Sequence, residues 1–501
     1  MRGSRALAVT LGVTLLFALL VVALPSWAAK PKRGNVPQLL VVSRPWPKLV
    51  SVRLLIGGGA LADPPGQEGL TALGWSVALR GAGSRDRQAL SQAFDALGVQ
   101  PGLGVDKLGT TLYADVASEN LEKCLELLAD VVLHPRFESA QVDNVREEMI
   151  ADIEHLHDDD AGLAVDAIGR YLYRGTLLGR PTGGTKASLQ TLTTASLSAW
   201  HSKQIGASNV HIGLSGAIDR PAAEALVHKL LGDFPTGPAL KPPPSKADDS
   251  GRRLLLIDKP RRAQAQVVLA LSTVPANHRD ALPLLLVNAV LGGPFTSRLN
   301  REIRELRGWS YGAWSSLSGA PNLSTWAMGF APNARDASAA IDLAVQILEE
   351  LRKDGISTAE LRFAKDYLIG AHRLGLETAD RELAERMRAT ELGLDDDEVD
   401  TFEKRIEAID HKTVQRVLRE RLRHDNLVAT VVGSAKTLRD KLTASAAAFA
   451  VEVLERNGLP EQTAQKGLTP AQRPATAVDA PAAATEDDDG AKGVEEEPDE
   501  P

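Results

Sequence analysis

Residues 137–145 read Phe-Glu-Ser-Ala-Gln-Val-Asp-Asn-Val, and residues 356–364 read Ile-Ser-Thr-Ala-Glu-Leu-Arg-Phe-Ala. Each stretch passes from a large apolar residue through short polar residues into apolar residues at helical spacing. The helical pattern continues through residues 149–150 after the first stretch and through 368–369 after the second. Both stretches therefore predict the same turn leading into a helix, and the offset between them is constant.

The segments that precede the two stretches also match. Amphipathic helical patterns cover residues 121–132 and 339–351, and strand-like runs cover residues 109–116 and 324–330. Strand, helix, turn and helix thus occur twice in the same order, which indicates a duplicated α+β domain. Chance similarity between two amphipathic helices is the alternative. The matched turn and the shared order favour duplication.

The duplication divides the chain into two predicted domains. Residues 36–233 and residues 253–460 each alternate strand-like and helix-like runs. Residues 234–252 between them are rich in proline and polar residues, which is typical of a semi-rigid linker.

The two ends of the chain differ from the domains in composition. Arg2 and Arg5 precede an uncharged run over residues 6–29, with small residues near its end. This pattern predicts residues 1–29 to be a signal peptide for export to the periplasm or outside the cell, or an uncleaved membrane anchor. From 461 to 501 the chain is acidic and poor in large apolar residues, so we expect a disordered tail.

The overall composition excludes some classes of function. The 501 residues are 44% hydrophobic and 24% charged, with a net charge of −8, which is ordinary for a globular protein. No basic stripe with interleaved aromatic residues indicates a nucleic-acid partner. The single cysteine, Cys124, cannot form an intrachain disulfide, and its place in an apolar helical run predicts a buried structural thiol.

Short motifs in a fixed order connect the chain to a known family. In the first half the motifs include Leu54-Leu-Ile-Gly-Gly-Gly-Ala60, Glu68-Gly-Leu70, Arg80-Gly81, Leu127-Leu-Ala-Asp-Val131, His134-Pro-Arg-Phe137 and Leu178-Gly-Arg-Pro181. In the second half Ser297-Arg-Leu299 leads into Ile303-Arg-Glu-Leu-Arg-Gly-Trp-Ser-Tyr-Gly312. With these motifs, residues 36–435 resemble the two-domain members of the insulinase/pitrilysin family of inverted-motif zinc metallopeptidases. The resemblance implies two homologous α+β domains, each an antiparallel or mixed sheet covered by helices, which together form half of a clamshell.

The zinc motif of that family is degenerate in this chain. Active members carry H-x-x-E-H on a helix, with two histidines on zinc and the glutamate as general base. Aligned on residues 69–70 and 80–81, these positions are Ala72, Trp75 and Ser76, and the distal ligand falls near Asp152. One carboxylate cannot make a site of three protein ligands. The resemblance therefore implies no zinc in this chain, and zinc in a partner.

One other segment of the sequence contains both histidines and carboxylates. His155 and His157 lie within the charged run over residues 154–160. Two histidines at this spacing do not share a helical face, and charge runs are usually solvated. We interpret this segment as a hydrated helix end rather than a metal site.

The second half retains a motif that the resemblance associates with catalysis. Arg304 and Tyr311 lie seven residues apart, with Gly308 between them. In the family, an arginine and a tyrosine at this spacing reach the active site across the chamber, where they bind substrate and steady the tetrahedral intermediate. The alternative is an amphipathic helix whose arginines, Arg304 included, face water, followed by a packed tyrosine. The surrounding motif favours the catalytic role.

Three functions remain open at this level. The first is a non-catalytic subunit that supplies chamber wall, peptide-binding surface and the Arg304–Tyr311 pair to a zinc-bearing partner of the same family. The second is a stand-alone scaffold that binds unfolded peptides, and the third is an active metallopeptidase with displaced ligands. Peptide would pair with a sheet edge. The glycine-rich stretch over residues 98–109 lacks the asparagine that family members carry near that edge. A membrane contact is expected only if the signal peptide stays uncleaved.

Overall fold

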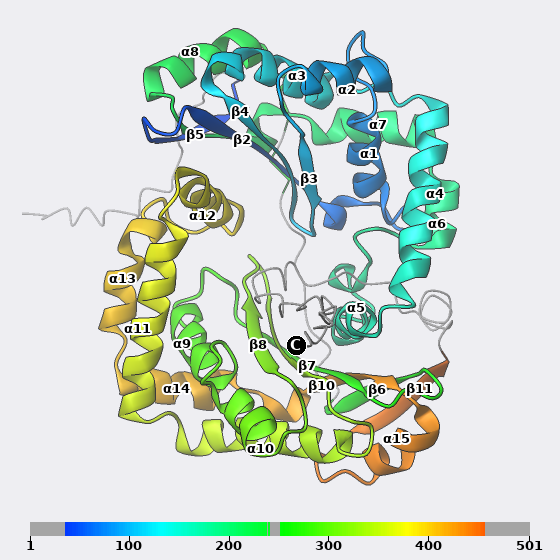
Figure 1. The fold of residues 1–501 in the computed structure, drawn as a ribbon, viewed down its shortest axis with the longest axis vertical. Coiled ribbons are helices and arrows are strands. Elements are labelled where there is room, and N and C mark those ends of the chain that lie inside the picture. Colours follow the sequence, from blue (N-terminus) through cyan, green and yellow to red (C-terminus); the bar gives the residue numbers. More distant parts are fainter. Residues whose placement is uncertain (1–35, 238, 241–250, 456–501) are drawn as a thin grey trace, which may run out of the picture.

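Two β-sheets, one built by each half of the chain, organise the molecule (Figure 1). The structure is a computed structural model that describes residues 36–237, 239–240 and 251–455. The predicted signal peptide or anchor (1–29), most of the central linker and the predicted acidic tail (461–501) lie outside the described residues. The expected α+β class, with a mixed sheet and helices in each half, is confirmed.

The first sheet has five strands in the order β1-β5-β2-β4-β3. The strands are β1 (Gln38–Ser43), β2 (Leu49–Gly57), β3 (Gly102–Val105), β4 (Gly109–Ala117) and β5 (Val210–Gly216). Only the β1–β5 pair is parallel, whereas β2 pairs antiparallel with β4 and β5, and β3 pairs antiparallel with β4. The short strand β3 forms one edge of this sheet.

The second sheet has six strands in the order β11-β6-β10-β7-β9-β8. The strands are β6 (Arg253–Asp258), β7 (Gln266–Thr273), β8 (Ala313–Ser318), β9 (Ser324–Phe330), β10 (Val428–Gly433) and β11 (Ala450–Glu455). The pairs β10–β6 and β11–β6 are parallel, and the remaining pairs are antiparallel. Strands β9 and β10 are buried along their whole length, which matches their almost continuous apolar sequences.

Helices cover both sheets. In the first half they are η1 (Ala60–Ala62), α1 (Leu70–Ala78), α2 (Arg87–Asp95), η2 (Ser118–Asn120), α3 (Leu121–Leu133), α4 (Ser139–Leu156), α5 (Asp160–Leu172), η3 (Leu177–Gly179), α6 (Lys186–Thr191), α7 (Thr194–Gln204), η4 (Ala207–Asn209) and α8 (Arg220–Leu231). In the second half they are α9 (Ala281–Leu291), η5 (Asn300–Glu305), α10 (Ala337–Asp354), α11 (Thr358–Gly375), α12 (Ala379–Glu391), α13 (Glu398–Ala408), α14 (His411–Arg421), η6 (His424–Asn426) and α15 (Ala435–Thr443).

The repeated order that the sequence predicts is present in both halves. Strand β4, helix α3 and helix α4 follow one another in the first half, and β9, α10 and α11 do so in the second. The turn into α11 has a local cause, because the Ser357 side chain accepts from the backbone of Glu360 while the Glu360 carboxylate accepts from Ser357 N–H. Cys124 is fully buried on α3, and burial raises the pKa of its thiol to about 11, as expected for a structural cysteine.

Each half contains one helix that packs on the sheet of the other half. These two helices, α5 and α12, are called the exchanged helices. Helix α5 packs on β7 and β10 of the second sheet, and α12 packs on β1 and β5 of the first (Figure 1). The Thr430 hydroxyl on β10 donates to the Ala164 carbonyl on α5 (2.9 Å). Beneath α12, Gly213 of β5 leaves room for Met387, whose Sδ would lie 2.4 Å from a Cβ at that position. The exchanged helices join the two halves into one body.

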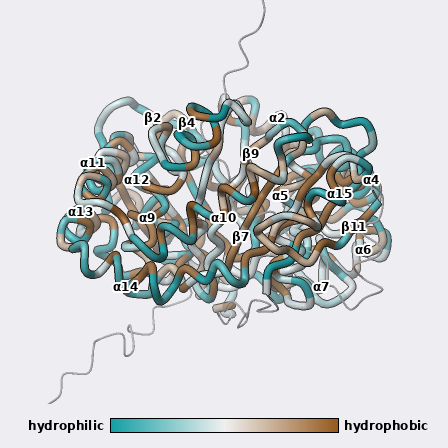
Figure 2. Tube along the Cα trace, turned by 90° about the horizontal axis from the view of Figure 1, so that it is seen from below, coloured by the Kyte–Doolittle hydropathy of each residue, from teal (hydrophilic) through white to brown (hydrophobic). Residues whose placement is uncertain are grey.

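Apolar residues line the contact where helix α5 meets the second sheet. Figure 2 shows brown segments along β7, β9 and α5, whereas the outer helices α13 and α14 are largely teal or pale. Within the described ranges, no helix has both the length and the apolar character needed to span a bilayer. The long apolar runs of this part of the chain are core strands and core helices.

Candidate functional site

Helix α1, which carries the degenerate zinc motif, begins on a buried carboxylate. Asp63 Oδ2 accepts from Gly69 N (2.9 Å) and Asp63 Oδ1 accepts from Thr71 N (3.0 Å). Burial raises the pKa of Asp63 to about 7 despite these hydrogen bonds. Gly69 has φ 91°, and a Cβ there would lie 2.8 Å from the Gly183 carbonyl oxygen, so this position requires glycine. The N-terminus of α1 is therefore rigidly placed.

The three residues at the zinc-motif positions have different surroundings. Ala72 and Ser76 lie one turn apart on a partly exposed face of α1, where family members carry the two histidines. Trp75 is only 1% exposed and belongs to the core of the first half. Its ring meets that of Trp200 edge-on at 5.6 Å between centroids. Ala72 and Trp75 offer no donor atom for zinc, and a serine hydroxyl alone cannot replace two imidazoles.

The distal position lies on α4, which packs against α1. Arg80 joins the two helices by donating through Nη1 to Glu148 Oε1 (3.0 Å) and through Nη2 to Oε2 (2.5 Å). Asp152 follows one turn later and is exposed. Among the residues that the structure describes, no group of three or more histidine, cysteine, aspartate or glutamate side chains could hold a metal ion. The side chains present here do not fit the zinc site of active family members.

The histidines do not supply a replacement site. His155 lies in the exposed last turn of α4, and His157 is its C-terminal cap, as expected for a hydrated helix end. His134 caps α3. The ring of His201 is packed near Trp75, with Nε2 2.7 Å from the Val132 carbonyl oxygen, and burial lowers its pKa. These contacts describe structural histidines.

The second predicted site lies in the segment between α9 and β8. Arg304 is part of η5, a π-helical turn, and such turns are frequent at functional sites. Gly308, with φ 62°, reverses the chain after this turn, and Trp309 N donates to the Ile303 carbonyl (3.0 Å). The reversal brings Tyr311 back beside Arg304, whose guanidinium carbon lies 5.3 Å from the Tyr311 ring centroid. The seven-residue spacing is thus explained by one helical turn and one glycine reversal.

Buried contacts fix this segment to the second sheet. The Asn300 side chain exchanges two hydrogen bonds with Ala313 at the start of β8, one through Nδ2 (2.5 Å) and one through Oδ1 (3.0 Å). The Ser310 hydroxyl accepts from Ala331 N (3.0 Å) and donates to the Gly312 carbonyl (2.6 Å). The backbone that presents Arg304 and Tyr311 is therefore held from both sides.

The four arginines of this segment have different partners. Arg298 makes a two-point ion pair with Glu360, and Arg301 and Arg307 pair with Glu302. Arg304 forms no ion pair with any residue that the structure describes. Arg301 and Arg307 are exposed, as the alternative of water-facing arginines expects, whereas Arg304 is half-buried and is the one of these four arginines without a carboxylate partner among the described residues.

Phe295 completes the surroundings of Arg304 and was not identified from the sequence. The Arg304 guanidinium carbon lies 3.9 Å from the Phe295 ring centroid. Phe295 is 58% exposed and Tyr311 is 82% exposed, which is unusual for large aromatic side chains. A proline and two glycines directly precede Phe295, so no helical or strand periodicity marks it in the sequence.

The predicted site residues do not come together within the chain. Ala72, Trp75, Ser76 and Asp152 lie in the first half, and Arg304 and Tyr311 lie in the second. Figure 1 shows α1 in the upper half and β8, which follows Tyr311, in the lower half. Strand β3, the expected peptide-binding edge, pairs only with β4 among the described strands.

Comparisons with known proteins support the sequence resemblance. Residues 39–186 match the family profile described as insulinase (peptidase family M16), and residues 191–368 match the peptidase M16 inactive domain. An uncharacterized zinc protease of Mycobacterium leprae is 30% identical over 371 residues, which cover 72% of this chain and 82% of that protein. An uncharacterized zinc protease of Bacillus subtilis is 23% identical over 353 residues, covering 70% and 85%.

Solved structures share the fold. The peptidase M16 inactive domain protein from Pseudomonas fluorescens has a TM-score of 0.74 and 24% identity, and the match covers 80% of this chain and 96% of that chain. A chain of Complex III2 from Candida albicans has a TM-score of 0.69 and 15% identity, with 81% and 97% covered.

Proposed function

Because the chain belongs to the insulinase (M16) family of peptidases, we propose that it is the non-catalytic subunit of a zinc endopeptidase complex of that family. In this proposal it supplies chamber wall, a peptide-binding edge and the Arg304–Tyr311 pair, and a second chain supplies H-x-x-E-H and zinc. The observation that carries the proposal is the contrast between the two sites. The zinc positions hold alanine, tryptophan and serine, whereas Tyr311 is exposed and Arg304 has no carboxylate partner within the residues that the structure describes.

The chemistry of the pair suits a catalytic role in another chain. A carbonyl under attack acquires negative charge, and preorganised donors near that oxygen stabilise the transition state. A guanidinium and a phenol are both donors, and neither hydrogen-bonds to any residue that the structure describes. An arginine that served only to hold the fold would be expected to have a carboxylate partner, as Arg298 has.

The edge strand β3 is proposed to hold the peptide. An unpaired strand edge presents a row of backbone donors and acceptors to an extended chain. Gly102 and Gly104 bring little side-chain bulk to this edge, and the side of Gly104 is open. The substrates would be unfolded peptides, because pairing with the strand requires an extended backbone.

The proposed complex contains more than one chain and lies outside the cytoplasm. The Candida albicans relative is a chain of a larger complex, so this fold is compatible with assembly into a multichain particle. Residues 1–29 read as an export signal, and we propose that the complex works in the periplasm or outside the cell.

The first test is co-purification followed by substitution. The chain should co-elute with a family member that carries H-x-x-E-H, and the reconstituted complex should cleave unfolded peptides. Arg304→Ala or Tyr311→Phe should lower its turnover by about ten- to a thousandfold, the usual cost of removing an oxyanion donor, without loss of assembly. Arg301→Ala, on the same turn, is the matched control and should leave turnover unchanged. Equal turnover for all three variants would contradict the catalytic role.

A stand-alone peptide-binding scaffold is the second candidate, and the unpaired edge of β3 favours it. It predicts that labelled unfolded peptides bind the purified chain by fluorescence anisotropy without any partner. A monodisperse homodimer that binds peptide and recruits no zinc-bearing chain would favour the scaffold. An active metallopeptidase with displaced ligands predicts stoichiometric zinc in the purified chain and cleavage that chelators inhibit.

A further inference from the structure

We propose that Phe295 is a positioning residue that holds the guanidinium of Arg304 in place beside Tyr311. The inference rests on the proposed function, since it assigns a support to the pair that acts there. The guanidinium carbon of Arg304 lies over both rings, 3.9 Å from the Phe295 ring centroid and 5.3 Å from that of Tyr311. Both rings are exposed, and the Arg304 guanidinium contacts each of them.

The exposure of Phe295 needs an explanation that packing does not give. A ring that is 58% exposed gains little from burial, and the core of the second half lies elsewhere. The face of the ring is instead covered by the guanidinium. Cation–π contacts of this kind stabilise modestly at exposed sites and more strongly when water is excluded. If the chamber closes on a peptide and excludes water, the contact between Arg304 and Phe295 becomes stronger.

The turn that carries Phe295 is anchored, so the ring can serve as a fixed support. Ser297 N donates to the Pro294 carbonyl (3.0 Å), which closes a turn around Phe295. Arg298 then donates through Nε and Nη2 to Glu360 (2.7 and 2.9 Å) and through Nη2 to the Gly355 carbonyl (3.1 Å). Burial disfavours the charge on Glu360, but the hydrogen bonds from Arg298 and Ser357 outweigh it and lower its pKa to about 2. The Glu360 carboxylate is thus a firm anchor at neutral pH.

The contacts with the two rings leave the N–H donors of Arg304 free to bind substrate. A contact over an aromatic ring does not consume the N–H donors of a guanidinium, and no hydrogen bond to a residue in the described part of the chain occupies those of Arg304. A free arginine side chain loses rotamer entropy when it is ordered. Ordering it in advance against Phe295 lowers the cost that would otherwise fall on the transition state.

The test uses three substitutions of Phe295 in the reconstituted complex. Phe295→Ala should lower kcat by about three- to tenfold with little change in KM, because the support that is lost acts in the transition state. Phe295→Leu keeps apolar volume without an aromatic face and should lower kcat as much as Phe295→Ala does. Phe295→Tyr keeps the aromatic face and should retain the wild-type kcat. In the Arg304→Ala background, Phe295→Ala should have no further effect, because both residues act through one guanidinium.

A second measurement on the isolated chain does not depend on catalysis. In the full chain labelled with ¹⁵N-arginine, the Arg304 Nε–H resonance is assigned by its loss in Arg304→Lys. It should move in Phe295→Ala and Phe295→Leu, as the ring current is removed, and stay in place in Phe295→Tyr. Phe363→Ala, which removes an exposed ring stacked on Tyr367 in α11, is the control and should not move it.

The two measurements separate the inference from the proposed function. If Arg304→Ala leaves turnover unchanged, the proposed function fails, and the resonance still decides whether Phe295 holds the guanidinium. If the resonance stays fixed in Phe295→Ala and turnover is normal, the positioning role is overturned. If Phe295→Leu supports full turnover, apolar volume at position 295 is sufficient, and the proposed role of the aromatic face in holding Arg304 is wrong.

Discussion

Arg53 on β2 donates to both carboxylate oxygens of Asp380 on α12, through Nε (2.8 Å) and through Nη2 (2.9 Å), although 327 positions separate them in the chain. Arg44 reinforces the same contact by donating to Glu382 (2.7 Å). These pairs lie at the place where a helix of the second half covers the sheet of the first. The exchanged helices therefore fix the two halves to each other.

The docking of α12 should be sensitive to volume at Gly213. A Cβ there would lie 2.4 Å from Met387 Sδ and 2.9 Å from Leu383, so Gly213→Val must displace the helix. We expect a loss of about 1–3 kcal/mol in the free energy of unfolding, as for other overpacked cores. Amide hydrogen exchange should accelerate in α12. Gly370→Ala, whose new methyl group would meet open space, is the control. Unchanged exchange in α12 would show that the helix does not depend on this fit.

The duplicated order of elements could be predicted, but the exchange of helices could not. Apolar periodicity located β4, α3, β9 and α10 because it reports which face of an element is buried. It does not report which sheet covers that face. Leu163 and Ile168 of α5 would look the same in a helix packed on its own domain, yet they pack on the second sheet.

The same limit applies to the site. Arg304 and Tyr311 were found through a motif whose spacing reflects a π-helical turn and a glycine reversal. Phe295 and Asp63 were missed because neither belongs to a periodic pattern or a motif. Phe295 acts through a neighbour in space, and Asp63 acquires its meaning only from burial against the start of α1.

Asp63 should make the protein less stable at high pH. Burial raises the pKa of its carboxyl from 3.8 to about 7 in the folded state. A raised folded pKa contributes stability that is fully present below about pH 4 and is lost as the pH rises through about 7. Between pH 5 and pH 9 the loss amounts to about 2–3 kcal/mol.

Asp63→Asn should remove this dependence, because the amide cannot ionise; it keeps an acceptor for one of the two N–H groups, Gly69 N or Thr71 N, that donate to Asp63. Urea unfolding of wild type and variant at pH 5, 7 and 9 measures the difference. Glu147→Gln, an exposed change from carboxylate to amide on α4, should leave the wild-type slope intact. Parallel curves for wild type and Asp63→Asn would show that Asp63 does not titrate in this range.

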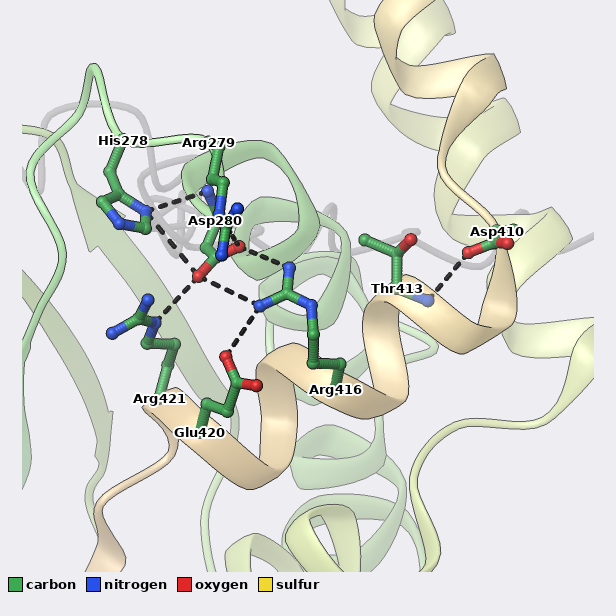
Figure 3. A network of polar contacts seen from close by, with 8 residues as sticks. All are labelled: His278, Arg279, Asp280, Asp410, Thr413, Arg416, Glu420 and Arg421. Carbon is green, nitrogen blue, oxygen red and sulfur yellow. Dashed lines mark hydrogen bonds and ion pairs between the residues drawn. The ribbon is translucent and has the colours of Figure 1, made fainter.

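Asp280 should produce the opposite pH dependence. Its carboxylate is fully buried and accepts from Arg416 Nη2 (2.6 Å) and Arg421 Nε (2.8 Å), as Figure 3 shows. Burial opposes its charge, but the two arginines outweigh burial and lower its pKa to about 2. A lowered folded pKa contributes stability that is present above about pH 4 and is lost as the pH falls through about 2.

Asp280→Asn should therefore cost about 2 kcal/mol at pH 7, since the fully buried carboxylate that pairs with two half-buried guanidinium groups is lost. The cost should shrink as the pH approaches 2, where about half of the wild-type carboxylates are protonated. Asp410→Asn, an exposed cap on the same helix α14, serves as control and should show a smaller loss. Thermal unfolding from pH 2 to pH 7 distinguishes the two variants. A constant difference between wild type and Asp280→Asn across that range would contradict the assignment.

Metal-site residues should be tolerated at positions 72 and 76 of α1, whereas a glutamate at position 75 should lower the free energy of unfolding. Ala72 and Ser76 share a partly exposed face, so Ala72→His with Ser76→His places two imidazoles one turn apart. We expect this double variant to fold and to gain measurable zinc affinity by calorimetry. It should not cleave peptides, because position 75 supplies no base.

Adding Trp75→Glu to that double variant should destabilise it by about 3–5 kcal/mol, as a large core side chain is lost and a carboxyl group takes its place beside Trp200. Trp75→Phe separates the two causes, because it removes volume without adding charge and should cost less. The free energy of unfolding in urea, with and without zinc, measures each step. A triple variant that is as stable as the double variant and cleaves peptide with zinc would show that the core packing of Trp75 is not what keeps this helix from being a metal site.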